Sequence, residues 1–190
     1  GKVGIIILGA IGDLTLSQLI CTRISHDLSG AMGAVYNGTE LLQDDPSFVT
    51  EATDLIQNSA KDLMARARFF RQTFGLPKDT EDTTKEYLKT FSLHFELDGV
   101  CTNNLQRALI MALTDYFYKG AVFAVSDNKI TATGNALKDC SVLDKLLQAG
   151  DGEIVAVNAP AFFAYHLAKQ MQRPIKIKTD TTACKIEINL

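Results

Sequence analysis

The sequence predicts an α+β fold in two parts, a helical hairpin over residues 1–77 and a two-layer α/β domain over residues 78–190. Two observations lead to this prediction. Apolar residues repeat at helical spacing from residue 14 to residue 74, with one proline-containing interruption. From about residue 83 onward, short helical patterns alternate with strand-like patterns. Helices that cover one face of an antiparallel or mixed sheet form a two-layer domain.

Each helix of the predicted hairpin carries one apolar stripe. Between the helices, Asp45 suits an N-cap and Pro46 suits the first helical position. Because two helices alone cannot bury such stripes, we expect two copies to pair as a four-helix bundle in a homodimer. The stripes are Leu16, Ile20, Ile24, Leu28, Ala31, Val35, Gly38, Leu42 and then Val49, Ala52, Ile56, Ala60, Leu63, Ala67, Phe70, Phe74.

The apolar N-terminal segment GKVGIIILGAIGDL is similar to a strand that enters a glycine turn. Only Gly9 and Gly12 fit the dinucleotide fingerprint, and the following residues read as helix, so we expect no nucleotide site there. The segment is far shorter than the roughly 20 apolar residues that span a bilayer. It also lacks the flanks of a signal peptide. We expect it to pack on a partner.

The predicted α/β domain alternates helices and strands. Helices are expected over residues 84–91, 102–120, 141–150 and 159–171. A strand is expected over residues 92–97, and hairpins over residues 121–134 and 174–190, the first turning at Asp127–Asn128.

Composition excludes several classes of function. The chain is 46% hydrophobic and 22% charged, as soluble globular proteins are, and its net charge of −3 argues against a nucleic-acid partner. Its four cysteines and three histidines have no metal-ligand spacing, so no metal site is expected. We predict buried free thiols and a cytoplasmic location, with no membrane partner.

His26 is predicted to face water. Residues two apart on a helix differ in direction by about 200°, so His26 points away from Ile24 and Leu28. Gly30 and Gly33 follow on the same face, although glycine weakens a helix interior by about 1 kcal/mol. Glycine is expected where another protein must approach the backbone closely. The candidate partner-binding residues are therefore Gly30, Gly33, Ser29 and Asn37. An ordinary exposed histidine is the alternative.

Basic residues are predicted near His26. If the hairpin turns near Asp45, His26 lies level with the segment that contains Arg66 and Arg68. Guanidinium groups suit phosphoryl oxygens, and a neutral imidazole is a competent nucleophile. The candidate catalytic residues are His26 with its helpers Asp27, Arg23, Arg66 and Arg68. A solvated basic face is the alternative interpretation of these arginines.

These residues match a known family. The segment LICTRISHDLSGAMGAVYNGTELL resembles the phosphoacceptor segment of histidine kinase dimerisation domains, and more closely that of the ChpT-type histidine phosphotransferases of alphaproteobacterial phosphorelays. Residues 68–75, RFFRQTFG, are similar to the end of that family's second helix. The matched residues are Cys21, Arg23, His26, Asp27, Leu28, Gly33, Ala34, Asn37, Gly38, Glu40, Leu41 and Leu42.

The resemblance implies a dimeric hairpin bundle followed by a domain shaped like a kinase ATPase domain. It implies that His26 takes a phosphoryl group from the receiver domain of a hybrid kinase and passes it to a second response regulator. The chain would carry no cofactor, because the partner receiver brings Mg²⁺. Gly30 stands where many kinases carry a polar residue that positions a hydrolytic water, so phosphatase activity by that route is not expected. A proline that is frequent nearby in the family is absent.

The second domain is predicted to be a degenerate ATPase-like domain that does not bind ATP. Met111 and Asp115 stand where kinases carry Mg²⁺-binding asparagines, and the segment ITATGNAL has one glycine and no aspartate. A histidine kinase core that binds ATP and a non-enzymatic dimeric scaffold are the two alternatives. Of the remaining histidines, His94 is expected on the surface and His166 at the boundary of the core.

Overall fold

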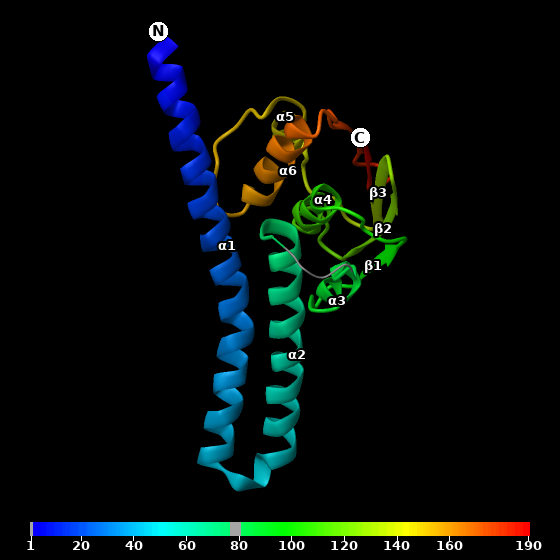
Figure 1. The fold of residues 1–190 in the computed structure, drawn as a ribbon. Coiled ribbons are helices and arrows are strands. Elements are labelled where there is room, and N and C mark those ends of the chain that lie inside the picture. Colours follow the sequence, from blue (N-terminus) through cyan, green and yellow to red (C-terminus); the bar gives the residue numbers. More distant parts are fainter. Residues whose placement is uncertain (1, 77–80) are drawn as a thin grey trace.

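A long helical hairpin stands beside an α/β unit (Figure 1). The computed structural model describes the backbone of residues 2–76 and 81–190, and the side chains of residues 12–76 and 81–190. Helix α1 (Lys2–Asp44) and helix α2 (Val49–Phe74) run antiparallel and are joined by the 3₁₀ turn η1 (Pro46–Phe48). The predicted α+β class is therefore confirmed.

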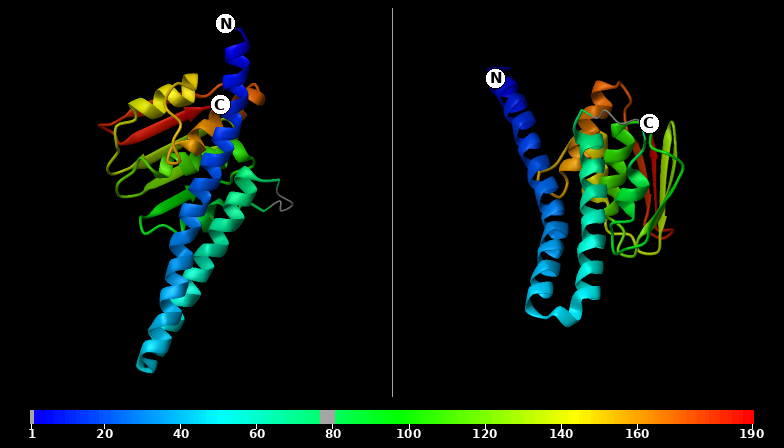
Figure 2. Two further views of the ribbon diagram at one scale, coloured as in Figure 1. Left: turned by 90° about the vertical axis from the view of Figure 1, so that its left-hand side faces the viewer. Right: turned by 60° about the horizontal axis from the view of Figure 1, so that its bottom comes forward.

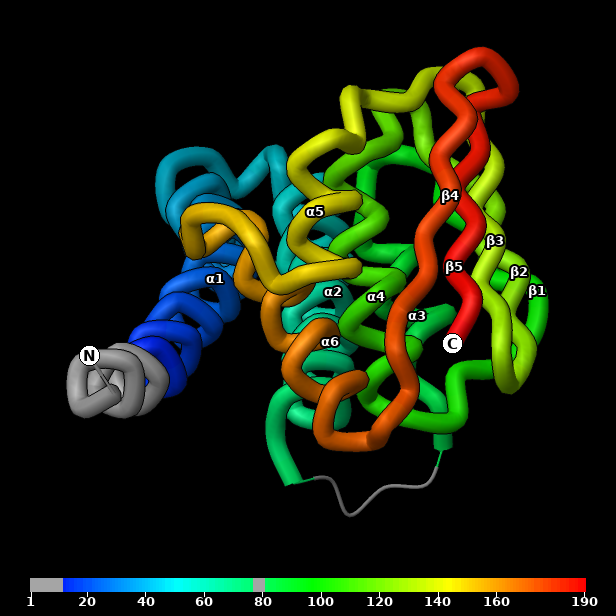
Figure 3. Tube along the Cα trace, turned by 90° about the horizontal axis from the view of Figure 1, so that it is seen from above, coloured from blue at the N-terminus to red at the C-terminus, as the bar shows by residue number. Residues whose placement is uncertain are grey.

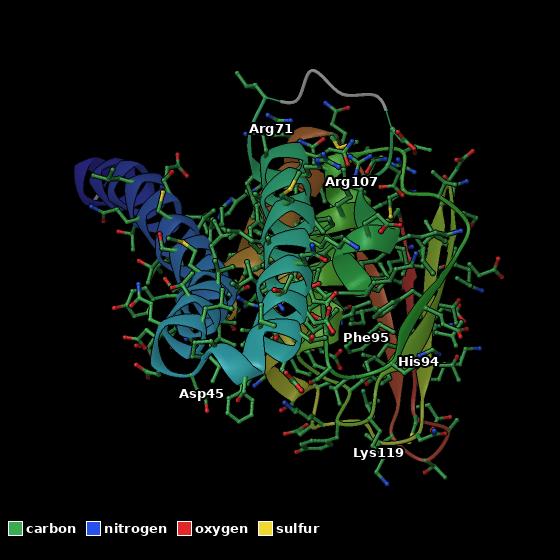
Figure 4. The ribbon with its side chains drawn as sticks, turned by 90° about the horizontal axis from the view of Figure 1, so that it is seen from below. Asp45, Arg71, His94, Phe95, Arg107 and Lys119 are labelled. Carbon is green, nitrogen blue, oxygen red and sulfur yellow. The ribbon has the colours of Figure 1, made fainter. Side chains whose placement is uncertain are left out.

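The hairpin turn is closed by an N-cap. Oδ1 of Asp45 accepts a hydrogen bond from the Ser47 backbone N–H at 2.9 Å, and Pro46 begins the 3₁₀ turn. Asp45 lies at the tip of the hairpin, as Figure 4 shows. An N-cap side chain satisfies one of the backbone donors that a helix start leaves free. The predicted cap is confirmed, although it caps one 3₁₀ turn that leads into α2.

The two helices meet along the predicted stripe of α1. Leu16, Ile20 and Gly38 are buried. A Cβ added at Gly38 would lie 2.5 Å from Cγ1 of Ile56, so this glycine permits the close approach of α1 to α2.

The stripe of α2 is only partly as predicted. Val49 and Ala67 are exposed, whereas Ser59 is buried. Val49 and Ala67 are about five helical turns apart and therefore share one line along α2. Around α2, Val49 and Ala67 lie to one side of the residues that contact α1, and Ser59 lies to the other side of them. The prediction was wrong at these positions because the apolar stripe is wider than the contact with α1.

The N-terminal segment is helical and not strand-like. α1 begins at Lys2 and continues without interruption through the glycines of this segment. The side chains of residues 2–11 lie outside the described part, and so does the predicted packing of this segment on a partner. Within the described residues, no helix is both long and apolar enough to cross a membrane.

The α/β unit is a five-stranded sheet with helices on the side of the hairpin. Its elements are α3 (Thr84–Leu88), β1 (Phe95–Asp98), α4 (Asn104–Thr114), β2 (Ala121–Ser126), β3 (Lys129–Gly134), α5 (Ser141–Ala149), α6 (Ala159–Gln170), β4 (Lys176–Asp180) and β5 (Lys185–Asn189). Helices α4, α5 and α6 lie between the hairpin and the sheet (Figures 2 and 3). The strand order is β1-β2-β3-β5-β4, with β1 parallel to β2 and the other neighbours antiparallel.

Both predicted hairpins of the sheet are confirmed, but the longest predicted helix of this unit is shorter than expected. α4 ends at Thr114, whose Oγ1 donates back to the Met111 carbonyl at 2.6 Å. Phe117 then forms a β-bridge with Leu137. The chain turns at Gly120, whose φ of +86° lies in the region that glycine tolerates. Local pairing after Thr114 thus replaces the last turns of the predicted helix.

A chain of aromatic contacts fixes the α/β unit to the hairpin. Phe69 of α2 stacks on Tyr87 at a centroid distance of 3.8 Å. The contacts continue through Phe91 and Phe95 to Phe123 of β2. Such ring pairs contribute about 0.5–1.5 kcal/mol each beyond the area they bury. One core is therefore shared across the predicted boundary at residues 77 and 78, and the predicted division into two domains remains a prediction.

Polar contacts fix the chain where it enters α3. Asp82 accepts hydrogen bonds from Arg107 Nε at 3.1 Å and from the Cys101 backbone N–H at 2.8 Å. The side chains of both members of this ion pair are at most 10% exposed. Breaking a buried pair on one side leaves an unpaired charge, which is strongly destabilising. Arg107 lies on α4 (Figure 4), so this pair joins the chain after α2 to the core helix of the α/β unit.

Candidate functional site

His26 faces solvent from the middle of α1. Its side chain is 86% exposed, in agreement with the predicted orientation. Nδ1 of the ring lies 3.4 Å from Oδ1 of Asp27, which is the long end of the hydrogen-bonding range. With Nδ1 beside the carboxylate, Nε2 is the ring nitrogen available to a partner.

Asp27 and Arg23 form a half-buried ion pair one turn from the imidazole. Nε of Arg23 donates to Oδ2 of Asp27 at 3.0 Å, and their side chains are 11% and 15% exposed. Nη1 of Arg23 also donates to Oδ2 of Asp115 at 3.2 Å and to the Val157 carbonyl at 2.8 Å. Asp115 directly follows α4, and Val157 lies in the segment between α5 and α6, which passes beside α1 in Figure 1. The α/β unit thus reaches into the site.

Burial and charge act in opposite directions in this cluster. Burial works against the charged guanidinium, but Asp115 and Asp27 outweigh it and raise the pKa of Arg23. Burial also raises the pKa of the Asp115 carboxyl, while the Arg23 charge lowers it. Because the arginine remains charged at any physiological pH, it holds both carboxylates in place.

Arg66 joins α2 to the same turn of α1. Its Nη1 donates to the Asp27 backbone carbonyl at 3.2 Å. Its Nε and Nη2 donate to Oγ1 and the carbonyl of Thr90 at 3.0 and 3.3 Å. The guanidinium carbon lies 5.5 Å from the ring centroid of Phe91, within the range of a cation–π contact. The sequence predicts that His26 lies level with the segment of α2 that contains Arg66, and the contact between Arg66 and Asp27 confirms this alignment.

Arg68 does not join this cluster. It lies two residues after Arg66 on α2, so it points about 200° away from it. Its side chain is exposed, and within residues 12–76 and 81–190 it has no hydrogen-bond or ion-pair partner. Of the two predicted helpers on α2, Arg66 therefore contacts the turn of α1 that holds His26, and Arg68 points away from it.

The predicted partner surface is open. A Cβ added at Gly30 or at Gly33 would meet nothing within 4 Å, and both residues are exposed. Asn37 is exposed as well, and Oγ of Ser29 donates back to the Ser25 carbonyl at 2.6 Å. Packing within one chain does not require glycine at positions 30 and 33, unlike at Gly38. These four residues line the surface that continues from His26 along α1.

Sequence reasoning missed the partners that the α/β unit supplies. Asp115, Thr90 and Val157 contact Arg23 or Arg66, yet no short-range pattern links them to His26. In the sequence, only Asp115 points to such a contact, because an acidic residue directly after a buried apolar helix needs a charged or hydrogen-bonding partner. Met111, one turn earlier, is fully buried in the core.

The other two histidines have contacts of their own, outside this cluster. His94 is on the surface as predicted, with Nε2 2.7 Å from Oε1 of Glu96, and Figure 4 places it near the sheet. His166 is exposed and not at the core boundary, because its ring turns outward next to Tyr165.

The sequence predicts that the four cysteines are buried free thiols, but only Cys101 and Cys140 are buried. Cys21 is exposed and Cys184 is half-buried. Cys21 lies on an uncovered side of α1, and Cys184 lies in the turn of the last hairpin. Among the described residues there is no group of three or more acidic, histidine or cysteine side chains that could hold a metal ion.

Comparisons with known proteins bear on the fold and on the family resemblance. No protein-family model matches the chain. The protein phosphotransferase ChpT of Brucella abortus (strain 2308) is 33% identical over 95 residues. That alignment covers 45% of this chain and 45% of the relative, so the chain matches about half the relative's length. A solved bacterial phosphotransferase superposes with a TM-score of 0.74 at 24% identity, over 92% of this chain and 95% of that chain. The chain therefore has the fold of that bacterial phosphotransferase, and its resemblance to the ChpT-type phosphotransferases is confirmed.

Proposed function

We propose that the chain is a histidine phosphotransferase that relays a phosphoryl group through His26. The observation that carries this proposal is the exposed imidazole of His26, with a carboxylate at Nδ1 and open space along the helix beyond it. The partial match to a curated ChpT phosphotransferase supports the same conclusion. In this proposal the donor is an aspartyl phosphate on the receiver domain of a hybrid kinase, and the acceptor is a second response regulator.

The transfer step is a displacement at phosphorus. The Nε2 lone pair of His26 attacks the phosphoryl group, a P–N bond forms, and the P–O bond to the receiver breaks to release the aspartate carboxylate. The ring carries a positive charge after the attack, and its Nδ1 proton is shared with Asp27. The reverse displacement passes the group to the acceptor aspartate. Such chemistry depends mainly on alignment and charge neutralisation.

The protein's own residues then have separate tasks. His26 is the nucleophile, and Asp27 selects the ring nitrogen that attacks. Arg23 lies one helical turn before Asp27 on α1, and Arg66 reaches the same turn from α2. Most of the N–H groups of Arg23 already donate to carboxylates and a carbonyl, so few of them are left for a phosphoryl oxygen. Arg66 uses three of the five N–H groups of a guanidinium in such contacts, which leaves two for a phosphoryl oxygen. In this proposal the receiver partner brings the Mg²⁺ ion.

Two further parts of the proposal concern assembly. Gly30 and Gly33, with Ser29 and Asn37, admit the receiver next to His26. Two copies of the hairpin pair through the side that turns away from the α/β unit. The predicted homodimer and the cytoplasmic location belong to the proposal and follow from the resemblance.

The chain offers matched controls for a direct test. It is incubated with a receiver domain that carries a labelled aspartyl phosphate, and acid-labile, base-stable label is measured on the chain. Label is expected on the wild type and on His94→Gln and His166→Gln, whose histidines are also exposed. Label is expected to be absent from His26→Gln. Label that persists on His26→Gln, or a wild type that stays unlabelled beside an active receiver, overturns the proposal.

The same experiment separates the alternatives. A histidine kinase core would label itself from ATP without a receiver, and a scaffold would not become labelled from either donor. The buried Met111 and the engagement of Asp115 with Arg23 favour the phosphotransferase over the kinase, because neither side chain is presented to a Mg²⁺–nucleotide.

A further inference from the structure

A single arginine joins three parts of the chain beside His26. Arg23 donates to Asp27 one turn away on α1, to Asp115 after α4, and to the Val157 carbonyl. Nη1 and Nη2 of Arg23 lie 3.2 and 3.4 Å from the two oxygens of Asp115, the fork-to-fork arrangement that fixes a guanidinium in one plane. The side chains of Arg23, Asp27 and Asp115 are 11%, 15% and 30% exposed.

The pair within α1 would not hold this geometry alone. Pairs four residues apart on a helix surface contribute only about 0.3–0.5 kcal/mol, and both side chains exchange between rotamers. Asp115 removes that freedom, since its two oxygens accept from both terminal nitrogens of Arg23. Nε is then directed at Oδ2 of Asp27 at 3.0 Å. The direction of the Asp27 carboxylate is thus set from the α/β unit.

The carboxylate of Asp27 has two oxygens with different tasks. Oδ2 is occupied by Arg23, and Oδ1 is the atom 3.4 Å from Nδ1 of His26. Arg66 holds the backbone carbonyl of the same residue. Because the carboxylate is held at one oxygen and its backbone is held as well, its other oxygen stays beside the imidazole.

We propose that Asp115 is a positioning residue for His26, which acts through Arg23 and Asp27 from the α/β unit. This inference rests on the proposed function and extends it, because it gives the α/β unit a part in preparing the nucleophile. Asp115 keeps the Nδ1–H tautomer of His26 in excess, so Nε2 carries the lone pair that attacks. The α/β unit then contributes to the transfer rate without touching the phosphoryl group.

The test reads the imidazole directly. The full chain is labelled with ¹⁵N-histidine, and the ring-nitrogen shifts of His26 are compared in the wild type, Asp115→Ala and Asp115→Asn. We expect the Nδ1–H tautomer of His26 to predominate in the wild type and to lose its excess in both variants. The signals of His94 and His166 serve as internal references, and Asp127→Ala, at the exposed turn between β2 and β3, is the control variant.

Transfer kinetics give the second readout. At saturating receiver, we expect the rate constant of transfer to fall about tenfold in Asp115→Ala, which corresponds to about 1.4 kcal/mol, with an unchanged KM for the receiver. Asp115→Glu keeps the carboxylate and is expected to restore part of the loss. Circular dichroism confirms that each variant is folded, and the isosteric Asp115→Asn replaces Asp115→Ala if that variant unfolds.

The two proposals fail separately. A wild type that accepts no phosphoryl group sinks the proposed function, whereas the tautomer measurement needs no donor. Asp115→Asn with wild-type His26 ring shifts and a wild-type transfer rate overturns the positioning role of Asp115. Loss of rate through a raised KM alone also overturns it, because that result assigns Asp115 to receiver binding.

Discussion

Nη1 of Arg66 on α2 donates a hydrogen bond at 3.2 Å to the backbone carbonyl of Asp27 on α1. Asp27 is the residue that directly follows His26. The same guanidinium donates to the hydroxyl and carbonyl of Thr90, which follows α3. Arg66 is therefore a three-way link between the two helices of the hairpin and the α/β unit. These contacts give Arg66 a structural role at the turn of α1 that contains Asp27.

Replacing Arg66 tests that link. Arg66→Ala removes three hydrogen bonds from a charged donor and the contact with Phe91, so we expect the free energy of unfolding to fall by about 1–3 kcal/mol. Arg68→Ala, two residues away and exposed, is the control and is expected to change it by less than about 0.5 kcal/mol. Urea unfolding followed by circular dichroism measures both. Equal stabilities for the two variants would remove the structural role of Arg66.

The glycines of α1 are predicted to respond differently to alanine. At Gly33 an added Cβ meets nothing within 4 Å, so Gly33→Ala is expected to raise the free energy of unfolding by about 0.5–1 kcal/mol. At Gly38 the Cβ would lie 2.5 Å from Cγ1 of Ile56 and 3.3 Å from the Ala52 carbonyl oxygen. Gly38→Ala is therefore expected to lower it by about 1–3 kcal/mol. Thermal unfolding of Gly33→Ala and Gly38→Ala measures the difference. If Gly38→Ala is the more stable of the two variants, α1 does not pack against α2 at Gly38.

A larger side chain at the same open position tests the docking of the receiver. Gly33→Leu keeps the helix and the hairpin contact, since nothing lies near this position. It places bulk on the surface beyond His26, so we expect receiver affinity to fall about tenfold or more while the oligomeric state is kept. Titration of a labelled receiver measures the affinity, and Gly33→Ala is the matched control. Wild-type transfer by Gly33→Leu would count against docking along this face.

Much of the fold could be predicted because its signals are local. The stripes of the hairpin, the cap at Asp45 and the turn at Asp127–Asn128 depend on spacing and on residue type within a few positions. The outward direction of His26 follows from helix periodicity alone. The surroundings of His26 depend instead on partners such as Asp115, 92 residues from Arg23 in the chain, and periodicity carries no information about such partners.

The position of Arg68 follows from a local rule instead. Residues two apart on a helix differ in direction by about 200°, so Arg68 points away from the contact that Arg66 makes with α1. The helix predicted over residues 102–120 runs past the observed end of α4 at Thr114, because the side chains of residues 115–117 are compatible with a helix. Tertiary contacts decided there, since Phe117 pairs with Leu137 and Asp115 pairs with Arg23.

The predicted homodimer has a candidate face. On α1, Leu14 and Met32 are 62% and 56% exposed, and on α2 Met64 is 54% exposed. Helical geometry places them on the side of the hairpin that turns away from the α/β unit. Exposed apolar side chains on that side are expected to pack against a second copy as a four-helix bundle.

One charged substitution tests this face. Met64→Glu would bury two like charges in a symmetric interface, so we expect it to convert the dimer to a monomer in sedimentation velocity. Val122→Glu is the control, because Val122 is 43% exposed on the open face of the sheet and is expected to leave the dimer intact. A wild-type chain that sediments as a monomer would refute the dimer.

The thiol of Cys101 predicts how stability changes at alkaline pH. Burial raises its pKa from 9.0 to about 12, so the folded chain keeps the proton after the unfolded chain has lost it. Stability from this group is fully present below pH 9 and is lost as the pH rises toward 12, by about 1.4 kcal/mol per pH unit. The Cys101→Ala variant has no thiol at this position, so its free energy of unfolding should not show this loss. The amount by which it is less stable than the wild type should therefore shrink between pH 9 and pH 10.5. Cys21→Ala, at an exposed cysteine, is the control and should follow the wild type. Urea unfolding at a series of pH values measures the difference, and a deficit that stays constant across this range would show that the Cys101 thiol titrates alike in the folded and unfolded chain.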